Sequence, residues 1–369
     1  MSDRLYLGTR KGVFTLRRSP TGRWSVWKVA FLADPASIVL SDARDGTLYA
    51  ALDLGHFGVK LHRLRANARK WEEIAAPAFP EGADPAASST AEPSAAAPSV
   101  SKVWALAAGG TDQPGWLWCG TIPGGLFLSK DGGKNWELVR SLWDHPQRKE
   151  WFGGGAIHPG IHSVCVDPRD SRRLAVGVSC GGVWRSRDAG ASWELRGTGM
   201  RAAYMPPERA MDPVIQDPHM MVRCPAAPDV LWVQHHNGIF RSDNDCESWS
   251  EIKNVQPSSF GFAVAVHPKD ADTAWFVPAQ SDEKRVPVDG QVVVNRTRDG
   301  GRSFETLRKG LPQRHAYHLV YRHGLDVDPT GRQLAFGSTT GGLWISEDGG
   351  DSWKSPAPHL PPVYCVRFG

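Results

Sequence analysis

One motif recurs along the whole chain, and this repeat constrains the fold more than any other feature of the sequence. The pattern Ser/Thr-x-Asp/Asn-x-Gly-x-x-Trp/Phe has five copies, one with cysteine in place of glycine, which begin at Ser129, Ser186, Ser242, Thr297 and Ser346. Two weaker copies precede them, and the seven closing aromatic residues stand 47 to 65 residues apart, at Trp24, Trp71, Trp136, Trp193, Trp249, Phe304 and Trp353. Repeats of this length are typical of propeller blades, and seven of them fill the 369 residues.

The residues of the motif suit a tight turn. A short Asp or Ser side chain accepts hydrogen bonds from turn N–H groups, and glycine supplies the positive φ that such a turn requires. The motif resembles the Asp box of the sialidase-like (BNR-repeat) propellers, which include proteins described as exo-sialidase-like or photosystem-assembly-factor-like. The resemblance covers the whole chain and implies an all-β fold, a seven-bladed β-propeller of four-stranded blades.

Each repeat unit predicts four short strands, A to D, as in the segments 161–168, 174–178, 182–186 and 193–196. The chain begins with a B-type strand at 5–9 and ends with an A-type strand at 363–368. We predict that these two strands pair, which closes the ring into a single domain over 1–369 and removes exposed sheet edges. The Ala/Pro/Ser-rich segment 75–101 is predicted to be a low-complexity surface loop that buries no apolar surface.

Composition and charge limit the classes of partner that we expect for this protein. A net charge of +4, with scattered basic residues, argues against nucleic acid or a membrane surface as partner. No apolar run approaches the roughly 18 residues that span a bilayer, and no basic-then-apolar leader stands at the N-terminus. The six cysteines are dispersed without CxxC spacing, which favours reduced thiols. We therefore expect a cytoplasmic protein.

Histidines point to one face of the propeller. The strand order puts the D–A and B–C loops on one face and the Asp boxes on the other, and the resemblance implies that ligands bind on the D–A/B–C face. Three A strands start with histidine at the same blade position, at His162, His219 and His323, where the sixth blade has Phe262. Because inner strands converge on the axis, we expect a metal site there, with His158 and His235 as further metal ligands. Zn, Mn, Fe or Cu would suit it, and no organic cofactor is indicated. The alternative is that these histidines cap strand ends and bind channel water.

Other polar residues of the same face are candidates for catalysis and substrate binding. The catalytic candidates are Glu150, Asp217 and His236, which could exchange protons with a reacting group. Charged or aromatic-rich loops are predicted to contact substrate through Arg10, Lys11, His145, Arg148, Glu283, Arg285, His315 and His318.

These features favour a metal-dependent hydrolase or lyase that acts on a small polar molecule or a saccharide at the axis. The first alternative is a non-catalytic ligand-binding or assembly propeller with a protein partner, like the photosystem assembly factors that share the repeat. A lesser alternative is a glycosidase that uses Glu150, Asp217 or Glu283. The sialidase resemblance implies an Arg-Ile-Pro motif before the first blade, but the similar Arg285-Val286-Pro287 lies inside the sixth. The classical sialidase residues are therefore not matched.

Overall fold

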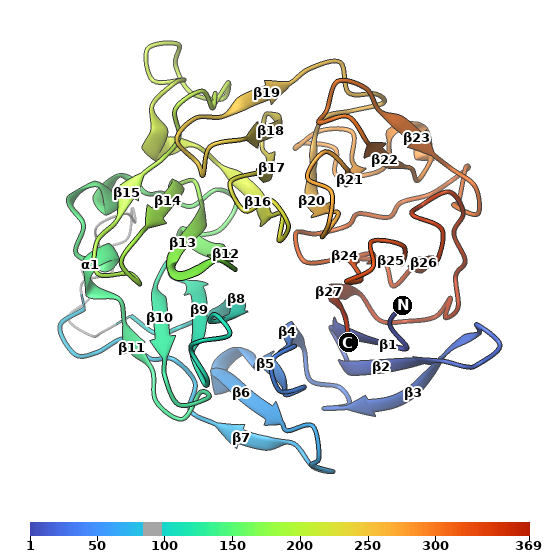
Figure 1. Ribbon diagram of the computed structural model, residues 1–369, viewed down its shortest axis with the longest axis horizontal. Helices are drawn as coiled ribbons and strands as arrows, with labels where there is room; N and C mark the ends of the chain where they lie inside the picture. The colour runs from blue at the N-terminus through green and yellow to red at the C-terminus, as the bar shows by residue number, and fades with distance from the viewer. Residues whose placement is uncertain (84–97) are drawn as a thin grey trace.

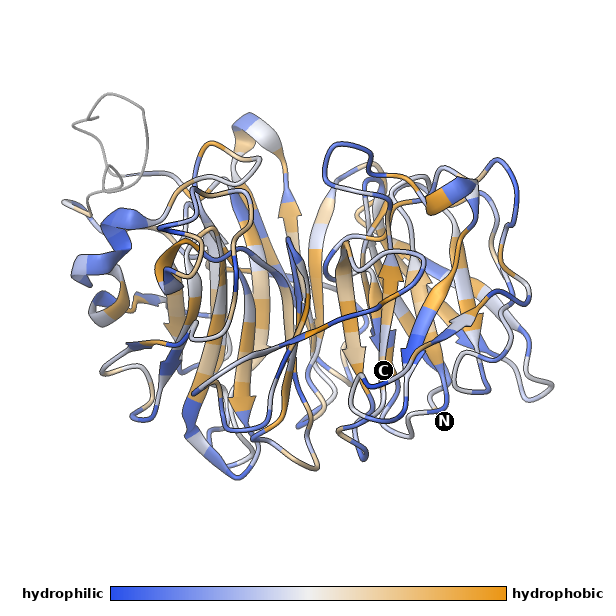
Figure 2. Ribbon diagram, turned by 90° about the horizontal axis from the view of Figure 1, so that it is seen from above, coloured by the Kyte–Doolittle hydropathy of each residue, from blue (hydrophilic) through white to orange (hydrophobic). Residues whose placement is uncertain are grey.

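The computed structural model describes residues 1–83 and 98–369, and in this part of the chain seven antiparallel sheets surround a central axis (Figure 1). The predicted seven-bladed β-propeller is confirmed. Seen edge-on, the ring is a disc whose hydrophobic residues concentrate in the strands (Figure 2). Tryptophans with less than 2% exposure, such as Trp118, Trp184 and Trp232, fill the space between neighbouring sheets. The core is therefore distributed around the ring, between blades.

The blades follow the chain order. The first contains β27 (Val363–Phe368), β1 (Arg4–Thr9), β2 (Gly12–Arg18) and β3 (Trp24–Ala30). The second contains β4 (Ala36–Ser41), β5 (Leu48–Asp53), β6 (Val59–Leu64) and β7 (Glu72–Ile74). The third contains β8 (Lys102–Ala108), β9 (Leu117–Ile122), β10 (Leu126–Ser129) and β11 (Glu137–Leu138). The fourth contains β12 (Gly160–Asp167), β13 (Asp170–Ser179), β14 (Gly182–Ser186) and β15 (Glu194–Leu195).

The remaining blades repeat the same order. The fifth contains β16 (Pro218–Arg223), β17 (Leu231–His235), β18 (Gly238–Ser242) and β19 (Ser250–Ile252). The sixth contains β20 (Gly261–Val266), β21 (Ala274–Pro278), β22 (Val294–Thr297) and β23 (Glu305–Leu307). The seventh contains β24 (Leu325–Val327), β25 (Leu334–Gly337) and β26 (Leu343–Ser346), with a bridge from Ile345 to Lys354 at the place of a fourth strand. Short helices occur in loops, at η1 (Gly55–Phe57), α1 (Arg140–Trp143), η2 (Pro146–Glu150), η3 (Pro213–Ile215) and η4 (Val288–Gly290).

The ring closes as the sequence predicts. The last strand, β27, pairs antiparallel with β1 from Leu5 opposite Phe368 to Thr9 opposite Val363. The two chain ends consequently lie side by side (Figure 1). The N–H of Phe368 also donates to Asp326 Oδ2, at 2.8 Å, in the seventh blade. The closing strand is thus held by its own blade and by the seventh blade.

The predicted turns have one shared hydrogen-bond pattern. In the fourth blade Ser186 Oγ donates to Asp188 Oδ1 at 2.8 Å, and the N–H of Gly190 donates to Ser186 Oγ at 2.8 Å. The aspartate then accepts from the N–H of Ser192 at 2.8 Å. The same bonds recur in the turns that start at Ser129, Ser242, Thr297 and Ser346. The repeat therefore specifies a self-satisfied turn.

The segment 75–101 departs in part from its prediction. Phe79, near its start, is only 7% exposed and packs against Phe127 and Trp143, with ring centroids 5.2 and 4.7 Å apart. This stretch therefore buries apolar surface, because an aromatic ring fills a gap beside the third blade. The rest of the predicted loop, residues 84–97, lies outside the described residues. Within the described residues, the structure has no helix that is long and apolar enough to span a membrane.

Candidate functional site

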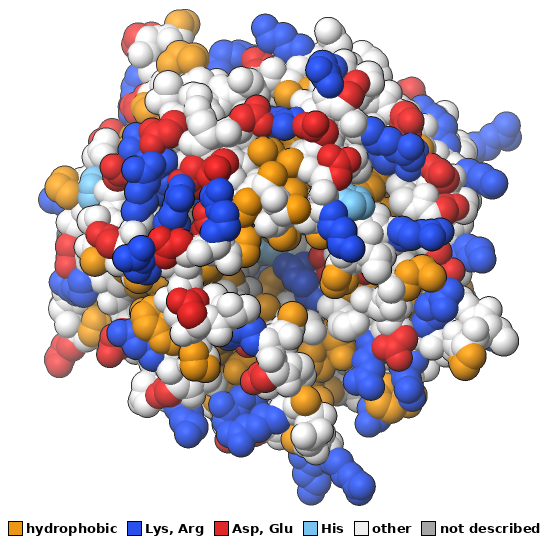
Figure 3. Space-filling view, viewed as in Figure 1, with side chains coloured by type: hydrophobic (Ala, Val, Ile, Leu, Met, Phe, Trp, Pro, Cys, Tyr) orange, Lys and Arg blue, Asp and Glu red, His pale blue; other side chains and the backbone are white. Residues whose placement is uncertain are grey.

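A cavity of about 1180 Å³ opens at the centre of the ring. Its walls come from the loops between blades, from the loops between second and third strands, and from the starts of the inner strands. Figure 3 shows this central hollow, with basic and hydrophobic side chains visible inside it. The cavity thus lies on the D–A/B–C face, opposite the repeated turns that start at Ser129, Ser186, Ser242, Thr297 and Ser346. We call these the Asp-box turns, after the motif that they resemble, and their side of the ring the Asp-box face.

Register shifts in the inner strands supply the cavity with side chains. In β12 the pairing passes from Ile161 directly to Ser163, which leaves His162 as an extra residue, and in β16 it passes from Pro218 to Met220 around His219. A bulge of this kind leaves one residue outside the ladder and re-aims its side chain. Equivalent shifts affect Ser37, Trp104, Phe262 and Tyr364 in four other blades. The bulges therefore turn one residue of most blades toward the axis.

The three strand-start histidines do not form a common ligand set. His323 extends its Nε2 to the carbonyl oxygen of His162, at 2.8 Å, while His162 Nδ1 lies 2.8 Å from Ser163 Oγ. Burial lowers the pKa of His323 to about 3 and that of His162 well below its usual value. Register shifts place His162 and His219 as extra residues in their strands, whereas His323 lies just before β24 (Leu325–Val327) and bonds to the backbone of His162. His219 turns instead toward Asp217.

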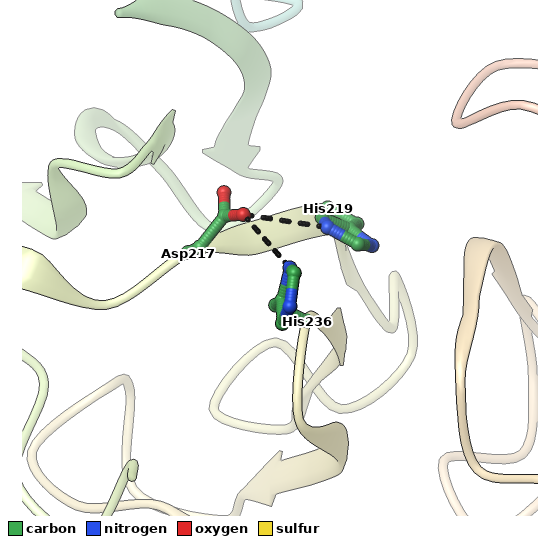
Figure 4. Close-up of side chains that lie close together, drawn as sticks. All are labelled: Asp217, His219 and His236. Atoms are coloured by element: carbon green, nitrogen blue, oxygen red, sulfur yellow. Dashed lines mark ion pairs between the residues drawn. The ribbon is translucent and has the colours of Figure 1, made fainter. Parts of the chain in front are cut away.

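His219 meets Asp217 and His236 (Figure 4). His219 Nε2 and His236 Nδ1 each lie 3.4 Å from Asp217 Oδ2. Among the described residues, this is the group of three His, Cys, Asp or Glu side chains whose ligand atoms all lie within 4.8 Å of one another. We call these three residues the Asp217 cluster. Its members come from the loop before β16, from β16 itself and from the turn after β17.

Local structure fixes Asp217. The short helix η3 is capped by Asp212 and ends just before it, and Pro218 keeps the backbone of the preceding residue extended. Its Oδ1 accepts from Ser179 Oγ at 3.0 Å and from the N–H of Cys180 at 3.1 Å. Only Oδ2 therefore faces the two histidines.

His235 holds the same loop from behind. Its Nε2 accepts from the N–H of Asp217 at 3.0 Å, and its ring has no exposed surface. Burial lowers the pKa of His235 to about 3, so it is neutral. It is a structural neighbour of the cluster and lies outside the cavity lining.

Partners on the far side of each ring orient the histidines. His219 Nδ1 lies 2.7 Å from the carbonyl oxygen of Gly261, and since a carbonyl only accepts, this nitrogen carries the proton. The ring also stacks on Phe262, with centroids 4.4 Å apart. His236 Nε2 faces Asp282 Oδ2 at 3.9 Å. The other nitrogen of each ring is thereby directed at Asp217.

Charges and hydrogen bonds within the cluster shift the pKa of the Asp217 carboxyl in the direction opposite to burial. Burial alone would raise the pKa of the Asp217 carboxyl, but the charge of His219 and hydrogen bonds from both histidines outweigh it, and the pKa lies well below its usual value. Burial lowers the pKa of His219, although the Asp217 carboxylate acts in the opposite direction. The cluster is thus a carboxylate that faces two imidazoles.

Several predicted residues line the cavity and others do not. Asp217, His219 and His236 meet in the cluster, and Arg10, His158, Arg285 and His323 also line the cavity. His145 and Arg148 instead border a separate cavity of about 250 Å³ beside α1. Glu150 lies 3.7 Å from Arg209, and His318 Nδ1 is bonded to Ser338 and Thr340, each away from the central lining. Lys11, Glu283 and His315 are exposed and also absent from the lining.

Sequence reasoning missed Arg322, which lines the cavity beside His323. In the aligned inner strands the equivalent positions hold Ile161, Pro218 and Gly261. A charged residue in a position that is otherwise apolar or glycine was the available signal.

The comparisons with known proteins place the chain among propellers. No family model matches it. The oligoxyloglucan-reducing end-specific xyloglucanase of Emericella nidulans is 27% identical over 243 residues, which are 64% of this chain and 25% of that protein. The chain thus spans about a quarter of the length of this curated relative.

Solved structures show the same fold at low identity. A GH74 xyloglucanase from Xanthomonas campestris superimposes with a TM-score of 0.64 and 16% identity, over 97% of this chain and 53% of that one. A putative 6-phosphogluconolactonase from Bacteroides fragilis gives a TM-score of 0.55 and 11% identity, over 99% and 97%. The protein YCF48, solved bound to a D1 peptide, gives 0.51 and 12%, over 87% and 82%.

Proposed function

We propose that this protein is a metal-dependent hydrolase that cleaves a saccharide or a related small polar molecule in the central cavity. The proposed ligands of the metal ion are Asp217 Oδ2, His219 Nε2 and His236 Nδ1. One observation carries this proposal, namely that both nitrogens stand 3.4 Å from the same carboxylate oxygen. In a tetrahedral site with bonds of about 2.1 Å, neighbouring ligand atoms are about 3.4 Å apart.

The outer contacts of the cluster fit the same interpretation. A histidine that binds a metal ion commonly donates its other ring N–H to a carbonyl or carboxylate, and a ligating carboxylate is itself hydrogen-bonded. His219 meets this pattern through Gly261, His236 faces Asp282, and Asp217 accepts from Ser179 and Cys180.

The donor set limits the metal and its chemistry. Two imidazoles and one carboxylate suit Zn, Mn, Fe or Cu, and three protein ligands leave a position for water or substrate. A metal ion bound there would lower the pKa of that water and supply a nucleophile at neutral pH. The buried cluster and the bonded Oδ1 of Asp217 keep the three ligand atoms in place. Hydrolysis therefore requires no organic cofactor.

The saccharide part of the proposal draws support from the relatives. The curated relative and one of the solved structures are named as xyloglucanases. Because the chain matches only part of each, the class of substrate is carried over but xyloglucan itself is not. A cavity of about 1180 Å³ is large enough for a small oligosaccharide.

Metal analysis of protein purified without a histidine tag tests the proposal. We expect about one equivalent of a divalent transition metal in the wild type and almost none in His219→Ala or His236→Ala. His318→Ala is the matched control, because His318 is a half-buried histidine outside the cavity lining, and it should keep the metal. Wild-type protein without stoichiometric metal, even after incubation with Zn²⁺ or Mn²⁺, would contradict the metal site.

Activity is tested separately with aryl glycosides and aryl esters of sugars. We expect chromophore release that stops with 1,10-phenanthroline and returns when metal is added. The Asp217→Asn variant should fall to background, because an amide does not replace the ligand charge. Hydrolysis that continues at the same rate in the presence of the chelator would point to a metal-free glycosidase. A protein that binds metal but hydrolyses none of these substrates would favour a binding propeller.

A further inference from the structure

Arg322 is a half-buried cation of the central cavity that forms no ion pair within 4.0 Å among the described residues, although the charge of Asp217 acts on it from farther away. Its guanidinium carbon lies 4.6 Å from the ring centroid of Trp104 and 5.3 Å from that of Phe262. The Nε atom is buried and has no hydrogen-bond partner, and no carboxylate of the described residues lies within 4.0 Å of this guanidinium. Burial lowers its pKa to about 10, so it is still charged at neutral pH.

Several other buried arginines of this chain have carboxylate partners. Four of them pair with acidic side chains at 3.0 Å or less, namely Arg63 with Glu72, Arg185 with Glu194, Arg223 with Asp245 and Arg296 with Asp351. Arg241 is the nearest analogue of Arg322, because its guanidinium lies 5.1 Å from the centroid of Trp232. That guanidinium is bonded to both Asp243 and Asp272 at 2.7 Å. Arg322 is half-buried and lines the cavity, so an anionic group of a ligand can reach its guanidinium and supply the partner that Asp243 and Asp272 supply to Arg241.

The surroundings of Arg322 connect it to the Asp217 cluster. Phe262 contacts Arg322 on one side and stacks on His219 on the other. Arg285 also lies over Phe262, at 5.4 Å, but is bonded to Asp282. Arg10 lines the same cavity. One aromatic ring therefore separates the unpaired guanidinium from the proposed metal ligands.

We propose that Arg322 binds an anionic group of the ligand, and that the cavity therefore takes small polar molecules that carry a carboxylate or a phosphate monoester. Both groups match the planar fork of a guanidinium, which pairs with two oxygens at once. The inference deepens the proposed function by naming the class of substrate, namely acidic sugars or sugar phosphates. The anion would anchor the substrate while its neutral part extends toward His219.

Calorimetric titration with D-glucuronate, D-glucose 6-phosphate and neutral D-glucose tests this assignment. The titrations are run with and without 1,10-phenanthroline, an uncharged chelator that does not compete for an anion site. We expect binding of at least one of the two anions, no measurable binding of glucose, and no requirement for metal. Preference for glucuronate would identify a carboxylate site and preference for the phosphate a phosphate site. Equal heats for all three sugars, or none for either anion, would overturn the proposal.

Two arginine variants make the test specific. Arg322→Met should weaken anion binding at least about tenfold, as expected for a lost charge-assisted hydrogen bond. It should melt at or above the wild-type temperature, because it removes a half-buried charge that forms no ion pair among the described residues. Arg241→Met should bind as the wild type does and melt lower. If Arg322→Met does not fold, Arg322→Gln takes its place, and unchanged affinity in a folded variant would refute the assignment. Because binding is read without metal, its outcome is independent of the metal analysis.

Discussion

The two faces of this propeller differ in how their polar groups find partners. On the Asp-box face, the Ser or Thr hydroxyl and the Asp or Asn side chain of each repeated turn bond to each other and to N–H groups of the same turn, and Arg169 is bonded to both Asp167 and Asp229. On the cavity face, two imidazoles and a carboxylate oxygen converge, and the Arg322 guanidinium contacts two aromatic rings. Local satisfaction explains why one face can repeat without change. The groups that converge on the other face are those to which we assign a metal ion and an anionic ligand, and this contrast locates the proposed site.

The largest expected difference between the two faces is the effect of acid on stability, because a buried histidine lies on the cavity face. The folded-state pKa of His323 is about 3, below the ordinary value of about 6.5, so its contribution to stability is present above pH ~6.5 and is lost as pH falls toward 3. Hydrogen bonds from Ser303 lower the pKa of Asp299 to about 2, so the Asp-box turns are unaffected in that window. Between pH 6.5 and 4, His323 alone should cost the fold about 3 kcal/mol of unfolding free energy.

Urea unfolding at pH 7, 5 and 4 measures this effect. The His323→Gln variant should lose less stability than the wild type over the same pH range. Part of the dependence of stability on pH should remain in this variant, because His162 and His235 are also buried and neutral. Identical pH slopes in wild type and variant would show that His323 is not held neutral in the fold.

A smaller effect is expected at Asp282, which faces His236 Nε2 from outside the Asp217 cluster. The Asp282→Asn change should lower metal affinity about tenfold, the low end of the range for an outer partner, because the 3.9 Å contact is long. Competition with a fluorescent chelator gives the affinity. Asp243→Asn, on the Asp-box face, is the control. An equal loss in both variants would mean that general electrostatics, and not the orientation of His236, sets the affinity.

The smallest effect is expected within the Asp-box turns. Ser186→Ala removes the hydroxyl that accepts from Gly190 and donates to Asp188, and it should cost about 1 kcal/mol of unfolding free energy. Metal content and anion binding should not change. Thermal or urea unfolding checks the first expectation, and a coupled loss of metal would show that the two faces are not independent.

The repeat alone predicted the architecture, because each Asp box specifies its own turn and the spacing counts the blades. The strand order within the repeats also located the closing strand, and the family resemblance indicated the face that carries the cavity. The equivalence of His162, His219 and His323 was readable from the alignment of inner strands. Their side-chain directions were not, because they depend on bulges and on which backbone carbonyl each ring meets. Arg322 was not among the predicted site residues, because its role is inferred from the carboxylates that do not contact it, and these contacts depend on three-dimensional packing.

Anomalous diffraction from a zinc-soaked crystal, recorded above the zinc absorption edge, tests the central claim most directly. The Asp217 cluster should show one strong peak about 2.1 Å from Asp217 Oδ2, His219 Nε2 and His236 Nδ1. Density that is absent there, or a peak bound by other histidines such as His162 or His323, would contradict the assignment of the site.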